Sequence, residues 1–114
     1  MKKALVIILI LLLASMAWAL NYKNLLWADG DTLIKSGPGH LNSFIINQAV
    51  TTTTQVVLWD GLASTGTIIA TIEINTATNG QMASALHYGC QFRTGLFVDL
   101  SATTTDLDVT LVYN

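Results

Sequence analysis

Short runs that alternate apolar and polar residues constrain this chain more than any other feature. The clearest run covers residues 106–113, in which every second residue from Leu107 to Tyr113 is apolar. A period of two places such side chains on one face of a β-strand. No segment after residue 20 has a long apolar period of 3.6 residues, and Thr, whose branched side chain suits strands, is abundant. The pattern predicts an all-β domain.

Seven strands are expected from residue 32 onward, because turn-forming residues interrupt the apolar runs at intervals typical of a sandwich. The expected strands are 32–36, 40–50, 54–60, 67–75, 82–88, one within 92–101, and 106–113. The predicted fold is an antiparallel, jelly-roll-like β-sandwich of about seven strands. Seven apolar residues on alternating strands should be buried in its core: Ile68, Ile72, Leu96, Val98, Leu107, Val109 and Leu111.

The N-terminal stretch has the three parts of a secretory signal peptide. Lys2 and Lys3 precede an unbroken apolar run over residues 4–14, and Ala17-Trp18-Ala19 matches an A-x-A cleavage site. We expect residues 1–19 to form an apolar signal helix, residues 20–31 a leader arm, and residues 32–114 the sandwich domain. An uncleaved membrane anchor is the alternative, although the apolar stretch falls short of the roughly 20 residues that a bilayer requires.

The charge balance excludes two classes of partner. After residue 19 the chain has three basic residues against seven acidic ones, a net charge of −4. This balance argues against nucleic acid, whose phosphates are bound by Lys and Arg. It also gives no polybasic attraction to lipid, so membrane contact is expected only through an uncleaved N-terminal segment.

The single cysteine, Cys90, allows no intrachain disulfide, although small exported domains often depend on one. Stability must then come from the core or from neighbouring subunits. Only 11% of all residues are charged, against about 25% in an average protein. Such a weakly charged surface favours association.

No motif predicts an enzyme, a cofactor or a metal site. His87 and Cys90 are spaced three residues apart across an expected turn, but a zinc site needs further ligands, and a lone cysteine is typically a small buried residue. Asp29-Gly30-Asp31 begins like a calcium-binding loop, yet Ile34 stands where that loop requires Gly and His40 where it requires Glu. We therefore expect a non-catalytic protein.

Two expected strands are apolar on both faces. Residues 40–50 place Leu41 and Ile45 on one face and Phe44 on the other. Residues 54–60 likewise place Val57 and Trp59 on the face opposite Val56 and Leu58. Either a loop or the leader covers the second face, or another subunit does. The candidate partner-contact residues are Trp27, Leu41, Ile45, Val57 and Trp59. Surface aromatics also leave open a glycan-binding site.

Three stretches carry a resemblance to a known group of proteins. The segments IKSGPGHLNSFIINQ, VVLWDGLASTGTIIATI and FRTGLFVDLSATTTDLDVTLVYN resemble small all-β proteins encoded in tailed-phage structural gene clusters. The similar positions are residues 39–46, 58–70, 95–101 and 109–113, and the resemblance spans residues 32–114. It implies a capsid decoration or a head- or tail-associated protein, here with an added signal peptide, and transfers no functional residue.

Together these observations predict a non-catalytic structural protein that associates with copies of itself or with a larger virion-like assembly. We expect it in the periplasm, outside the cell or on a virion surface. A secreted module that binds glycans is the alternative.

Overall fold

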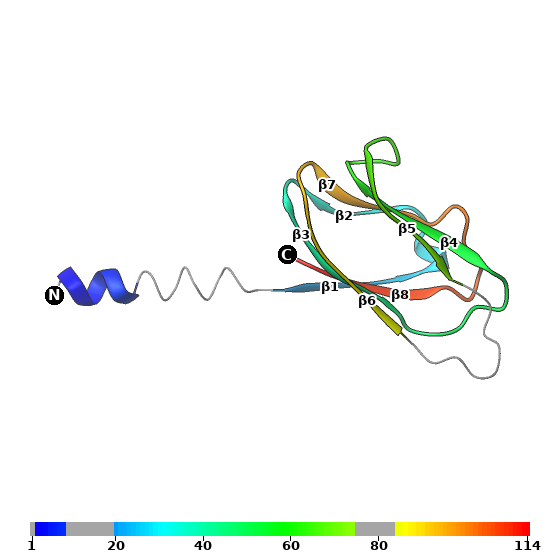
Figure 1. Ribbon diagram of the computed structural model, residues 1–114, viewed down its shortest axis with the longest axis horizontal. Helices are drawn as coiled ribbons and strands as arrows, with labels where there is room; N and C mark the ends of the chain where they lie inside the picture. The colour runs from blue at the N-terminus through cyan, green and yellow to red at the C-terminus, as the bar shows by residue number, and fades with distance from the viewer. Residues whose placement is uncertain (1, 9–19, 75–83) are drawn as a thin grey trace.

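The computed structural model describes residues 2–8, 20–74 and 84–114, and it folds the chain after residue 20 into two packed sheets (Figure 1). The elements are β1 (Asn21–Leu26), the 3₁₀ helix η1 (Trp27–Asp29), β2 (Thr32–Ser36), β3 (Gly39–Ile46), β4 (Thr54–Asp60), β5 (Thr67–Ile74), β6 (Ser84–Phe92), β7 (Gly95–Asp99) and β8 (Asp108–Tyr113). Sheet A has the order β1-β8-β3-β6, and sheet B has the order β2-β7-β4-β5. Every pairing is antiparallel. The predicted all-β sandwich is confirmed.

The described residues contain eight strands rather than about seven, because the segment assigned to a leader arm includes β1. Its six residues pair with β8 over their full length, and Leu25 is completely buried. Apart from Leu25, every β1 residue is exposed. β1 is an edge strand, so only one of its edges is paired, and only one of its side chains enters the core. For this reason its sequence shows no alternation of apolar and polar residues that would have predicted a strand.

An extra residue in β3 explains why this strand looked apolar on both faces. Leu41 pairs with Tyr113 and Ser43 with Val112, so Asn42 has no counterpart on β8. A one-residue bulge exchanges the faces of the strand on either side of it. Leu41 and Phe44 are therefore both completely buried. Leu41, a candidate partner contact, is instead a core residue.

A second bulge in β5 overturns one core prediction. Leu58 pairs with Ala70 and Trp59 with Ile68, which leaves Ile69 without a partner. Ile68 then shares the outer face with Trp59, and it is 50% exposed. The expectation that Ile68 is buried is wrong, because alternation along β5 does not continue through the bulge. The other six predicted core residues are buried.

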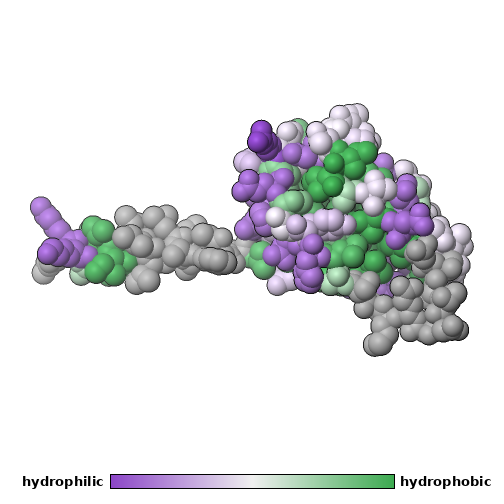
Figure 2. All heavy atoms as spheres, viewed as in Figure 1, coloured by the Kyte–Doolittle hydropathy of each residue, from purple (hydrophilic) through white to green (hydrophobic). Residues whose placement is uncertain are grey.

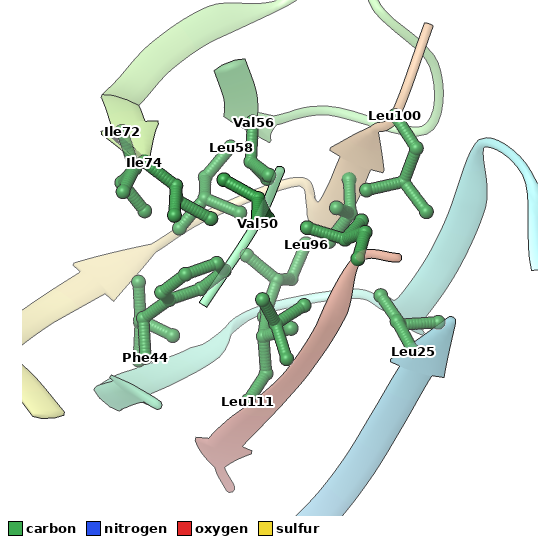
Figure 3. Packing of buried hydrophobic residues seen from close by; sticks show 14 of the residues in the cluster. Leu25, Phe44, Val50, Val56, Leu58, Ile72, Ile74, Leu96, Leu100 and Leu111 are labelled. Carbon is green, nitrogen blue, oxygen red and sulfur yellow. The ribbon is translucent and has the colours of Figure 1, made fainter. Parts of the chain in front are cut away.

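Both sheets contribute to a single core (Figure 3). Phe44 and Leu111 of sheet A meet Val56 and Leu58 of sheet B, and each of the four is completely buried. Val50 lies beyond the end of β3, which is shorter than expected, yet it is also buried. Each large apolar side chain transferred from water contributes about 1.5–3 kcal/mol, so this core dominates the stability of the domain.

The N-terminal prediction falls mostly outside the described residues. Residues 2–8 are helical and exposed, whereas the rest of the apolar run and the A-x-A motif lie in residues 9–19, which the structure does not describe. Among the residues that it does describe, no helix has the length and hydropathy needed to cross a membrane. Export and cleavage stay predictions.

Candidate functional site

The outer face of sheet A mixes polar and apolar residues in each cross-strand row. One row runs from Asn24 through Thr110 and Ile45 to Ala85. Thr110 lies between Val109 and Leu111, which are buried in the core, and this places the row on the outer side. Ile45 is half-buried in this row.

Polar groups on this face satisfy one another within the chain. The Asp108 carboxylate accepts hydrogen bonds from the side-chain amides of Asn24, at 2.7 Å, and Asn47, at 3.0 Å. The Asn47 amide also donates to the Thr110 hydroxyl at 2.9 Å. The network links β1 and β8 with the end of β3, so we assign it a structural role.

The outer face of sheet B carries a row made entirely of large apolar side chains. Leu33 pairs with Phe97, Phe97 with Trp59, and Trp59 with Ile68. One residue from each of the four strands therefore lies in a single line across the sheet. We call Leu33, Phe97, Trp59 and Ile68 the apolar row.

Exposure within the apolar row is greatest at its two ends. Leu33 on edge strand β2 is 43% exposed, and Ile68 on edge strand β5 is 50% exposed, whereas Phe97 and Trp59 are half-buried. The indole Nε1 of Trp59 is buried and has no hydrogen-bond partner among the described residues. Leu62, in the loop after β4, is 54% exposed and extends the apolar surface beyond the row.

The Asp60 carboxylate fixes the turn beside the apolar row. It accepts hydrogen bonds from the backbone N–H groups of Arg93 at 2.9 Å, Thr94 at 2.8 Å and Gly95 at 3.4 Å. These donors, Arg93 first, hold the pKa of Asp60 below its usual value. Asp60 thereby joins the end of β4 to the β6–β7 turn.

Most other carboxylates also accept hydrogen bonds in loops. Asp31 accepts from the backbone N–H of Leu100 at 2.7 Å, and Asp99 accepts from Ser101, which lowers the pKa of Asp99. The side chain of Thr104 and the backbone of Thr51 likewise lower the pKa of Asp106. Within residues 2–8, 20–74 and 84–114, no group of three or more His, Cys, Asp or Glu residues is placed to hold a metal ion.

His87 and Cys90 do not form a site. They lie in β6 rather than across a turn, and Gly89, at φ 58°, takes up the bulge between them. Cys90 pairs with buried Leu41 and packs against the core, and burial raises the pKa of its thiol. His87 is exposed and pairs with Ser43. The two side chains thus belong to opposite sides of the strand.

The structure separates the predicted contact residues. Val57 and Trp59 lie together on the outer face of sheet B, since Val57 pairs with Asp99 and Thr71 beside the apolar row. Ile45 lies on sheet A and Leu41 in the core, while Trp27 is 48% exposed in η1.

Sequence reasoning missed Leu33, Phe97 and Ile68 as surface candidates. Leu33 and Phe97 lie in apolar runs, but only the strand pairing brings them into line with Trp59. Nothing in the sequence marks the bulge that turns Ile68 outward.

A further apolar area follows the side of the sandwich formed by edge strands β5 and β6. In Figure 2 hydrophobic residues gather in the part of the view that these strands occupy in Figure 1, among polar neighbours. The half-buried residues there, Ile69, Ala70, Tyr88 and Cys90, pack against the core. These residues close the side of the sandwich. The apolar row is therefore the candidate contact surface that faces outward.

Comparisons with protein-family models, with curated proteins and with solved structures found no match.

Proposed function

We propose that this chain is a non-catalytic structural domain that acts by assembling with copies of itself or with a larger protein assembly. The apolar row carries the proposal. Four large apolar side chains form a line on the outer face of a sheet, and the two at its ends, Leu33 and Ile68, stay exposed. Exposed apolar surfaces of this kind usually mark contacts between proteins.

The strand order supports the same class of function. The arrangement β1-β8-β3-β6 against β2-β7-β4-β5 is that of an eight-stranded jelly roll with two interlocked Greek keys. Viral capsid proteins and lectins use this architecture. Together with the resemblance to small phage structural proteins, it favours a virion decoration or accessory role, with export directed by residues 1–19.

Sedimentation velocity tests the proposal on the protein recovered from expressing cells. Between about 1 and 200 μM, a range that covers contacts of moderate strength, the wild type is expected to form species larger than a monomer. The double variant Leu33→Asp/Ile68→Asp should be monomeric with an unchanged circular dichroism spectrum. A wild type that stays monomeric throughout, and that captures no protein from its source, contradicts an assembly role.

A glycan-binding module is the second candidate, and the exposed indole of Trp27 favours it. An aromatic ring that is accessible at one end of a jelly roll offers a stacking surface for a sugar. Binding on a glycan array that Trp27→Ala abolishes, and that Leu33→Asp leaves intact, would favour this function over assembly.

A further inference from the structure

We infer that β1 is an exchangeable strand, which detaches from β8 of its own chain and pairs with β8 of a second copy. The inference rests on the proposed assembly function, because strand exchange requires copies that are held close together. It names the edge of β8 as the contact and β1 as the segment that occupies it. Three observations support it: the low burial of β1, its connection to the sandwich, and the hydrogen bonds that β8 offers.

β1 contributes little to the core. Leu25 is its single buried residue, and its other five residues are exposed. As an edge strand of sheet A, β1 pairs with β8 alone. Segments with few buried apolar contacts open at a lower free-energy cost than the core does. β1 can therefore open while the other seven described strands keep the remaining members of the core together.

The connection between β1 and β2 allows β1 to swing away. No described strand precedes β1, and residues 27–31 link it to β2 in the other sheet. None of these five residues is buried. Gly30 lies at φ 65°, and glycine adopts either sign of φ at little cost, so the link can direct the chain along a second path. β1 can thus leave without the movement of any other strand.

The edge of β8 is specific for β1. When β1 leaves, β8 presents unpaired N–H and C=O groups, which form a template for another strand. The Asn24 side-chain amide donates to three acceptors on β8: the Asp108 carboxylate at 2.7 Å, the Val109 carbonyl at 3.0 Å and the Thr110 hydroxyl at 3.4 Å. Leu25 is completely buried opposite Val109. The β1 of a second copy has the same sequence and makes all of these contacts.

The local concentration of copies decides which β8 the strand occupies. The contacts are identical in the closed and the exchanged arrangement, and a short link keeps β1 near its own β8 at an effective concentration of the order of 1 mM. A single chain in dilute solution therefore stays closed. Copies held side by side in an assembly compete with the link, and exchange of an identical element is a low-cost way to join protomers.

Hydrogen exchange of the full wild-type chain tests whether β1 opens by itself. Amide protons of β1 that bond to β8 are expected to exchange at least about tenfold faster than those shared by β3 and β8, which require wider unfolding. Nuclear magnetic resonance measures both sets. Equal rates would show that β1 opens only with the whole domain, and the inference would then be wrong.

Disulfide trapping tests the exchange. Chains with Tyr22→Cys and differently tagged chains with Val112→Cys, both in a Cys90→Ala background, are mixed in urea and refolded together. Residues 22 and 112 are Cα partners across β1 and β8, at a separation that a disulfide can span. Each chain has one thiol, so a disulfide between the two kinds joins two copies. Its yield should rise severalfold when the protein concentration is raised from about 10 to about 200 μM, towards the effective concentration of the link.

A second pair of chains is the matched control. Gln55 and Glu73 are also Cα partners and are exposed, but their strands, β4 and β5, are connected within the sandwich at both ends. Chains with Gln55→Cys and Glu73→Cys should therefore form the mixed disulfide with a severalfold lower yield. Circular dichroism checks that all four variants are folded. Equal yields from the two pairs would overturn the exchange of β1.

The remaining outcomes separate this inference from the proposed function. Species larger than a monomer in sedimentation, without the disulfide between residues 22 and 112, overturn strand exchange but support assembly. A wild type that stays monomeric at every concentration, together with no disulfide between these positions, contradicts both.

Discussion

The two outer faces of this sandwich differ in where their side chains find partners. On sheet A, Asn24, Asn47, Asp108 and Thr110 hydrogen bond with one another, so these polar groups find partners within the chain, although Tyr22 and Leu26 on the same face stay exposed. On sheet B, the apolar row offers no polar group to neighbours, and its ends stay exposed. This difference is the basis for the proposal that sheet B, rather than sheet A, is the contact face.

The largest effect should come from the core that supports both faces. Leu111 and Thr110 are neighbours in β8, but Leu111 is completely buried and Thr110 lies on the polar face. Leu111→Ala is expected to lower the free energy of unfolding by about 2–5 kcal/mol. Thr110→Ala should lower it by about 1 kcal/mol, through lost hydrogen bonding. Urea denaturation measures both, and equal losses would show that the faces of β8 are wrongly assigned.

The next effect concerns Asp60, which anchors the turn beside the apolar row. Asp60→Ala leaves three backbone N–H groups without their acceptor and should cost about 1–3 kcal/mol in the free energy of unfolding. Asp60→Asn keeps one acceptor oxygen and should cost less. Thermal unfolding measures the difference, and a neutral Asp60→Ala variant would mean that the turn holds its shape without this carboxylate.

Acid provides an independent test of the same carboxylates. The pKa values of Asp60, Asp99 and Asp106 are lower in the folded chain than the ordinary value of 3.8. A lowered folded-state pKa stabilises the fold above the unfolded value, and that contribution disappears as the pH falls through the folded value. The free energy of unfolding should therefore fall below about pH 4, and less steeply in Asp60→Asn. A stability that does not change between pH 5 and pH 2 would contradict these roles.

The polar face should respond modestly to loss of its central carboxylate. Asp108→Ala removes the acceptor for Asn24 and Asn47, and we expect a loss of about 1 kcal/mol because the network is exposed to water. The oligomeric state, measured by sedimentation, should not change. A change in the oligomeric state would mean that sheet A also contacts other molecules, and the proposed difference between the two faces would then be wrong.

The smallest effect on folding is expected at the apolar row. Ile68→Thr should change the free energy of unfolding by about 0.5 kcal/mol or less, because half of the side chain is already exposed. Ile72→Thr, in the same strand but buried, is the matched control and should cost several times more. If both substitutions destabilise the monomer equally, Ile68 is part of the core and does not belong to the exposed apolar row.

Local patterns were sufficient for much of the fold. The bounds of β2 and β4 agree with the expected ranges 32–36 and 54–60, because turn residues on both sides of these strands stop the extended backbone. The inward side of β8 was also predicted, since no bulge interrupts its alternation between Leu107 and Leu111. Val57 and Trp59 were identified as surface candidates because residues 54–60 are apolar on both faces of the strand, and both residues lie on the outer face.

The sequence by itself determined that this chain forms strands and which side of most strands is apolar, because side-chain alternation is a property of each strand alone. Only the tertiary structure decided that residues 21–26 join sheet A, that Asn42 and Ile69 are bulges, and that Leu33, Phe97, Trp59 and Ile68 form one row. Pairing depends on a partner strand distant in sequence, and a bulge exists only relative to that partner, so neither can be read from one strand. The exposure of Ile68 and the burial of Leu41 follow from that register.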